Sequence, residues 1–214
     1  MNNDYKPILL LSAAAFLLCS VLAGAGLFRS LDVTVLRLAQ RGHWQVVDKI
    51  GLIASLLGGV EFVAVAATAL VAGLYARGRC RLATRLLVAF LVTGLIEIVF
   101  KTVVPQAPVP AAALRGEDPS LLDINTPYPY PSGHMLRAVL LFGAIYLLWA
   151  NGPIRLAIVA FLVVSAASRL YLGTHWPSDM LGATLLGIAG LAWAFQGSQS
   201  SATGRKPGRT GHPP

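Results

Sequence analysis

The chain has 214 residues, of which 56% are apolar and 12% charged, and its mean hydropathy is +0.67. Ordinary soluble domains carry about 25% charged residues, so this composition excludes a disordered chain and disfavours a water-soluble globule. The formal net charge of +8 could indicate a nucleic-acid partner. However, the basic residues do not gather on one face, so we expect no nucleic acid and interpret the charge as a signal of membrane topology.

Six apolar runs predict an all-α membrane bundle. A helix needs about 20 apolar residues to cross a bilayer of about 30 Å; the first, third and fifth runs are long enough alone, and flanking residues could extend the others. We therefore expect one domain over residues 1–196 with six transmembrane helices, at Pro7–Phe28, Val60–Ala76, Leu82–Val104, Ser132–Ala150, Pro153–Leu172 and Met180–Phe195. The first run resembles a secretory signal, but its length favours a retained helix.

The segments between the runs differ in character. Residues Arg29–Leu57 carry apolar side chains at helical spacing beside basic ones, a pattern that predicts a helix lying in the membrane interface; its first apolar positions are Leu31, Val35 and Leu38. The proline-rich stretch Pro105–Pro131 is predicted to be a long polar loop. Residues 197–214 are rich in Gly, Ser and Pro with three basic residues, which predicts a disordered basic tail.

The distribution of basic residues predicts the orientation. Six spans place both termini on one side of the membrane, and that side receives Lys6, Arg77, Arg79, Arg81, Arg85, Arg155, Arg205, Lys206 and Arg209. The positive-inside rule then places the termini in the cytoplasm and the loop before Pro131 in the periplasm or outside the cell. We expect an integral protein of a bacterial inner or cell membrane. Cys19 and Cys80 form no disulfide framework or metal-binding motif.

The first motif that indicates chemistry is Pro131-Ser132-Gly133-His134, at the start of the fourth run. Proline suits the first helical turn, and Ser132 and Gly133 would then present unpaired backbone N–H groups at the positive end of the helix dipole. Such an end is a ready anion site. A helix cap with an incidental histidine would explain these four residues equally well.

The second motif is Ser168-Arg169, five residues, His175, three residues and Asp179. His175 and Asp179 can share one helical face, and a carboxylate on one imidazole nitrogen leaves the other as a nucleophile. Arg169 can bind a phosphoryl group through two parallel hydrogen bonds. A snorkelling arginine beside an interfacial turn is the structural alternative, which the cost of ionisable groups in a membrane disfavours.

Together, these motifs resemble those of the type 2 phosphatidic acid phosphatase superfamily of membrane lipid phosphatases. The second and third motifs of that family match without a gap, and the resemblance extends to the six hydrophobic runs. The first motif, Lys, six residues, Arg-Pro, is only partly present: Lys101 stands where the lysine would be, but Pro108-Val109 replaces Arg-Pro. Arg137, one helical turn after His134, is the preferred substitute cation, and Arg115 in the loop is the other.

The resemblance implies a role for each matching residue. His175 would attack phosphorus and form a phosphohistidine, Asp179 would orient His175, and His134 would protonate the leaving oxygen. The phosphoryl oxygens would be held by Lys101, Ser132, Gly133 and Arg169, with Arg137 as the candidate substitute for the missing arginine. No metal ion and no other cofactor is needed, because fixed cations and N–H donors can neutralise the charge of phosphoryl transfer.

The expected function is hydrolysis of a lipid phosphate or diphosphate at the outer face of the membrane. The resemblance offers undecaprenyl diphosphate, phosphatidylglycerol phosphate and phosphatidic acid as substrates. A lipid phosphotransferase, in which an alcohol replaces water, is one alternative. A non-catalytic lipid-phosphate binding or transport protein is another, and the missing arginine lends it some weight. The oligomeric state does not follow from the sequence.

Overall fold

The computed structural model describes residues 5–42, 53, 56–115, 126–149 and 151–197. Regular structure within these ranges is entirely helical, which confirms the all-α prediction. The helices are α1 (Lys6–Gly24), α2 (Arg29–Ala39), α4 (Val60–Ala76), α5 (Cys80–Val103), the 3₁₀ helix η1 (Ala111–Ala113), α6 (Gly133–Trp149), α7 (Gly152–Leu172) and α8 (Pro177–Phe195). The predicted disordered tail lies, from residue 198 onward, outside the described residues.

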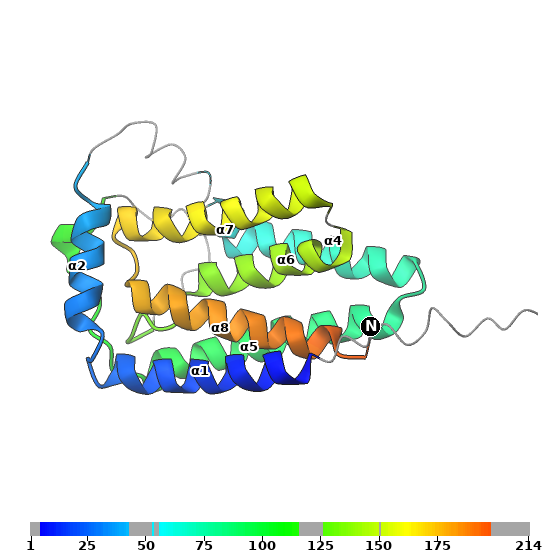
Figure 1. Ribbon diagram of the computed structural model, residues 1–214, viewed down its shortest axis with the longest axis horizontal. Coiled ribbons are helices and arrows are strands. Elements are labelled where there is room, and N and C mark those ends of the chain that lie inside the picture. The colour runs from blue at the N-terminus through cyan, green and yellow to red at the C-terminus, as the bar shows by residue number, and fades with distance from the viewer. Residues whose placement is uncertain (1–4, 43–52, 54–55, 116–125, 150, 198–214) are drawn as a thin grey trace, which may run out of the picture.

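Each of the six apolar runs forms a helix of the bundle (Figure 1). Four of these helices, α1, α5, α7 and α8, are long and apolar enough to cross a membrane. The other two, α4 and α6, are apolar but have 17 residues each, or about 26 Å at 1.5 Å per residue. The structure therefore supports an integral membrane protein, and six complete spans stay a prediction.

Helix α2 lies across one end of the bundle, where α7 ends and α8 begins (Figure 1). The first run stops at Gly24 rather than Phe28, because the chain turns there through Gly26, whose φ is +72°. The side chains of Asp32 and Leu36 are buried against the protein, whereas Leu31 is 58% exposed. This outward apolar face fits the predicted interfacial helix, although most of residues 43–57 lie outside the described part of the chain.

Helix α8 forms the centre of the bundle. In an apolar stretch of 18 residues, 72% of the α8 residues are buried, against 22–28% in the corresponding stretches of α1, α5 and α7. Helix α8 packs against α1, α5 and α6. Glycines permit this close approach: a Cβ at Gly182 would lie 2.3 Å from the Tyr130 hydroxyl, and one at Gly187 would lie 2.6 Å from a methyl group of Val139. The first turn of α8 therefore belongs to the most deeply buried of these four helices.

The opposite end of the bundle carries basic side chains stacked on aromatic rings. The guanidinium groups lie 5.0–5.8 Å from the ring centroids in the pairs Arg77–Trp149, Arg85–Trp193 and Arg155–Tyr146. Tryptophan, tyrosine and basic residues are enriched at membrane–water interfaces. These pairs therefore fit an interface at the end remote from α2.

Candidate active site

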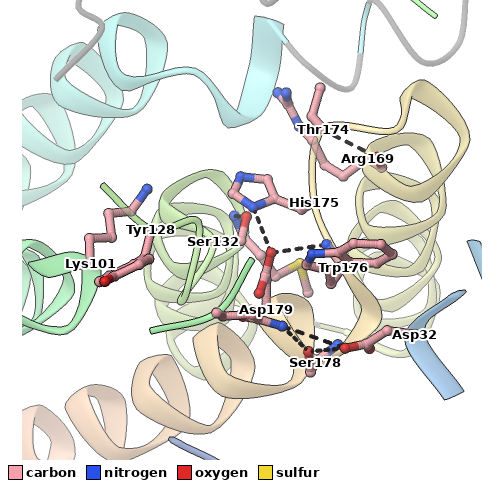
Figure 2. A network of polar contacts seen from close by, with 12 residues as sticks. Asp32, Lys101, Tyr128, Ser132, Arg169, Thr174, His175, Trp176, Ser178 and Asp179 are labelled. Carbon is pink, nitrogen blue, oxygen red and sulfur yellow. Dashed lines mark hydrogen bonds and ion pairs between the residues drawn. The ribbon is translucent and has the colours of Figure 1, made fainter. Parts of the chain in front are cut away.

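The turn between α7 and α8 holds the histidine–aspartate pair that the spacing predicts. Gly173, with φ of +72°, ends α7, and α8 begins at Pro177. Asp179 is completely buried, and its Oδ2 accepts hydrogen bonds from Nδ1 of His175 at 3.0 Å and from the backbone N–H of Trp176 at 2.9 Å (Figure 2). A carboxylate only accepts, so Nδ1 carries the proton and Nε2 of His175 is left with the lone pair.

Ser132 joins α6 to this turn. Its hydroxyl oxygen accepts a hydrogen bond from the N–H of Met135 at 3.4 Å, as a helix cap does, and its own N–H donates to the carbonyl of Asp179 at 3.2 Å. The prediction that Ser132 presents an unpaired N–H group is therefore wrong, because that N–H donates to the first turn of α8. Pro131 also lies outside the first turn, since α6 begins at Gly133.

Basic side chains from α5, α6, α7 and the turn after α7 converge on His134, which is 9% exposed near the start of α6. Lys101, Arg137, Arg169 and His175 all lie close enough to interact with it electrostatically. Figure 2 shows Lys101 and Arg169 on different sides of the His175 ring. The structure thus brings together three segments that are far apart in the sequence: Lys101, the motif at 131–134 and the motif at 168–179.

Glu97 links two of these cations. Its carboxylate lies 3.7 Å from Nζ of Lys101, the ion pair expected from their spacing, and 3.4 Å from Nη1 of Arg137. The carboxylate packs directly on Gly133, where a Cβ would lie 2.1 Å from its Oε1. Gly133 therefore makes room for the Glu97 carboxylate beside α6.

Arg115, the other substitute for the missing arginine, is used elsewhere. Its guanidinium donates to the carbonyl oxygens of Gln40 and Gly42, and it lies 4.8 Å from the ring centroid of Tyr171. It thereby fastens the loop to the ends of α2 and α7. Of the two candidates, the geometry favours Arg137 at the site.

Asp32 is a residue at the site that the sequence interpretation missed. It is 3% exposed, and it accepts hydrogen bonds from both the N–H and the hydroxyl of Ser178, next to Asp179. Burial raises the pKa of the Asp32 carboxyl group above its usual range, and the bonds from Ser178 oppose that shift. One signal was present: Asp32 lies one helical turn before the apolar Leu36, so the two side chains share a face of the helix.

No group of three or more His, Cys, Asp or Glu side chains within the described ranges could hold a metal ion. The charge in the site comes instead from lysine and arginine. That donor set suits phosphoryl or carboxylate oxygens rather than a cation.

Comparison with known proteins places these features in a family. The sequence profile of the PAP2 superfamily matches residues 82–202. An undecaprenyl-diphosphatase of Sulfolobus acidocaldarius is 37% identical over 87 residues, covering 37% of this chain and 36% of that protein. The putative undecaprenyl-diphosphatase YbjG of Escherichia coli is 39% identical over 61 residues, covering 28% and 30%. The chain thus matches about a third of the length of these curated relatives.

Solved structures share the fold. The transmembrane PAP2 type phosphatidylglycerolphosphate phosphatase of Bacillus subtilis superposes with a TM-score of 0.71 at 20% identity, over 87% of this chain and 94% of that one. Aquifex aeolicus LpxE gives a TM-score of 0.56 at 22% identity, over 75% and 93%. At these identities the likeness establishes the helical architecture.

Proposed function

The chain belongs to the PAP2 superfamily, and we propose on that premise that it is an integral membrane phosphatase acting on a lipid phosphate or diphosphate. The observation that carries the proposal is the contact between His175 and the buried carboxylate of Asp179, surrounded by the cations near His134. A nucleophile oriented by a carboxylate, with positive charge fixed around it, is what phosphoryl transfer requires.

In the proposed mechanism, the lone pair of Nε2 of His175 attacks phosphorus. A bond forms between Nε2 and phosphorus while the bond from phosphorus to the leaving oxygen breaks, and His134 gives that oxygen a proton. Water then attacks the phosphohistidine, His134 takes the proton from the water, and inorganic phosphate departs. Asp179 stabilises the imidazolium that forms on attack, as the carboxylate does in a hydrolase triad.

Lys101, Arg137 and Arg169 would hold the phosphoryl oxygens, together with the hydroxyl of Ser132 and the N-terminal end of α6 at Gly133. Fixed donors of this kind stabilise the transition state without reorganising during the reaction. Glu97 already pairs with two of the cations, so it would offset part of their mutual repulsion when no phosphate is bound.

A lipid substrate fits the surroundings of this site. The outer faces of α1 and α5 expose large apolar side chains such as Leu11 and Leu91, so an acyl or prenyl chain can remain in the bilayer while its head group reaches the site. Both curated relatives are named for undecaprenyl diphosphate, which favours that carrier lipid over phosphatidylglycerol phosphate and phosphatidic acid. In the proposed topology six helices span the membrane, the termini are cytoplasmic, and the site faces the periplasm or exterior.

The first prediction tests this function by phosphate release from undecaprenyl diphosphate, phosphatidylglycerol phosphate and phosphatidic acid. The purified protein should release phosphate in detergent, and His175→Ala should reduce the rate to background. Asp179→Asn should be less severe, because the nucleophile remains and only its orientation and charge support are lost.

The controls separate the alternatives. Each variant should elute as the parent does in size-exclusion chromatography, so that loss of folding is excluded. Product analysis with an added alcohol detects a phosphotransferase. If the parent releases no phosphate from any of the three lipids, or if His175→Ala retains more than about a tenth of its rate, the proposed function is contradicted.

A further inference from the structure

Asp32 makes a two-point contact with the turn that carries the catalytic pair. Its Oδ1 accepts a hydrogen bond from the backbone N–H of Ser178 at 3.0 Å, and its Oδ2 accepts one from the Ser178 hydroxyl at 2.7 Å (Figure 2). The carboxylate belongs to α2, 146 positions earlier in the chain. The contact therefore ties an element outside the bundle directly to the start of α8.

Helix α8 needs such a contact because its first turn lacks a side-chain cap of the usual kind. The first N–H groups of a helix have no partner within the helix, and Trp176, at the cap position, has no side-chain oxygen. The side chain of Asp179 is turned back to His175 and Trp176. Asp32 thus supplies both the missing acceptor for Ser178 and a negative charge at the positive end of the helix dipole.

A second brace reaches the same turn from the loop after α5. Nε2 of Gln106 donates to the Ser178 hydroxyl at 2.8 Å, and Nε1 of Trp176 donates to the carbonyl of Ala107 at 2.7 Å. Gln106, Trp176 and Ser178 are all buried. The residues between His175 and Asp179 are therefore held from two sides, by α2 and by the loop that follows Lys101.

We propose that Asp32 is a positioning residue for the reaction: it fixes the first turn of α8 so that the Asp179 carboxylate stays on Nδ1 of His175. This inference rests on the proposed function. Helix α2 then becomes a required part of the active site, with Asp32 acting through Ser178 rather than on the reacting atoms. Since displacements of about 1 Å in a reacting geometry can cost about 10²-fold in rate, loss of this contact acts on turnover more than on substrate binding.

The kinetic test compares three variants of the full-length protein in detergent. Asp32→Ala should lower kcat about tenfold or more with KM within about threefold of the parent, whereas Asp32→Asn, which keeps an acceptor for the Ser178 N–H, should recover most of kcat. The matched control is Leu36→Ala, one turn further on the same buried face of α2. It should lower thermal stability while the folded protein keeps parental kcat.

A spectroscopic test does not depend on activity. The Nδ1–H proton of a histidine bonded to a carboxylate gives a downfield NMR resonance, which can be assigned to His175 by its loss in His175→Ala. The resonance should persist in Asp32→Asn and Leu36→Ala and be lost or broadened in Asp32→Ala. If the parent and its variants show this pattern of resonances but the parent hydrolyses no lipid phosphate, the proposed function fails. The positioning role of Asp32 then stands.

Two results would overturn the inference: parental kcat and an intact resonance in Asp32→Ala, or an equal loss of kcat in folded Leu36→Ala. If Asp32→Ala fails to fold, Ser178→Ala takes its place. This variant removes the hydrogen bond from the Ser178 hydroxyl to Asp32 and keeps the one from the Ser178 N–H. We expect its kcat to fall about threefold or more, and a parental kcat there would overturn the inference as well.

Discussion

Arg137 is the side chain that could replace the arginine missing from the first motif. Where the family has an arginine, this chain has Pro108-Val109, and Arg137 reaches the same cluster from α6. Its Nη1 is paired with Glu97, while its Nε is buried and makes no hydrogen bond to the described residues. The Arg137 side chain is still 25% exposed beside Glu97, so its guanidinium group could also reach a phosphoryl oxygen.

The second prediction follows from this geometry. Arg137→Ala should lower kcat/KM by about 10²-fold or more, equivalent to about 2.7 kcal/mol, because charge-assisted contacts count most in the transition state. Arg115→Ala should leave kcat/KM near the parental value, since its guanidinium binds carbonyl oxygens of α2 and the following turn. Steady-state kinetics on the preferred lipid measure both, and parental kinetics in Arg137→Ala would dispose of its role.

The third prediction concerns the source of positive charge. Because lysine and arginine supply it, EDTA should leave phosphate release unchanged, and orthovanadate should inhibit competitively by occupying the phosphoryl site as a transition-state-like anion. Rates measured after dialysis against EDTA, with and without added Mg²⁺, provide the check. Activity that vanishes in EDTA and returns with Mg²⁺ would contradict a metal-independent mechanism.

At the scale of the helices, α8 packs closely against Tyr130 beside the site. Tyr130 is completely buried and its hydroxyl lies 3.1 Å from that of Ser20 on α1. The glycine at position 182 lets the tyrosine ring lie directly on the α8 backbone. The ring thus connects α1 and α8 directly before the motif Pro131-Ser132-Gly133-His134.

The fourth prediction tests that contact. Gly182→Ala places a methyl group 2.3 Å from the Tyr130 hydroxyl, and overpacking of this kind costs about 1–3 kcal/mol. We expect a clear fall in the thermal unfolding midpoint in detergent. Gly94→Ala in α5 is the matched control, because no other side chain lies within 4 Å of the added Cβ and alanine favours a helix. Equal midpoints for the two variants would argue against the contact.

The sequence predicted the helices better than it predicted their partners. Apolar runs identified six helices because burial in lipid or protein imposes hydrophobicity on every turn, and the spacing of His175 and Asp179 predicted a contact within one turn. The hydrogen bonds that Ser178 donates to Asp32 and Arg137 donates to Glu97 join distant segments, and no local pattern encodes such pairs. The N–H of Ser132 was misjudged for the same reason, since its acceptor is on another helix.

At the scale of the whole molecule, the two ends of the bundle differ chemically. One end carries the proposed site and α2, and the other carries the arginine–aromatic pairs and the turn between α4 and α5. Cys80, the first residue of α5 after that turn, is exposed, whereas Cys19 is buried. The natural sequence therefore contains its own reporter of orientation.

The fifth prediction uses that reporter. A membrane-impermeant maleimide should leave Cys80 unlabelled in intact spheroplasts and label it in inverted vesicles, because the positive-inside rule places this turn in the cytoplasm. As a control, Ala112→Cys in the exposed η1 helix, made in a Cys80→Ser background, should label from the outside. Labelling of Cys80 in intact spheroplasts would reverse the proposed topology.

The central place of α8 also has a consequence for biogenesis. Helix α8 is the last of the bundle to be synthesised, and it fills the space between α1, α5 and α6. Contacts between segments so far apart in sequence form late, so α1 must remain in the membrane without its main neighbour while the rest of the chain is translated. Because the same helix brings in Asp179, neither the centre of the bundle nor the proposed catalytic pair can be complete before α8 is in place.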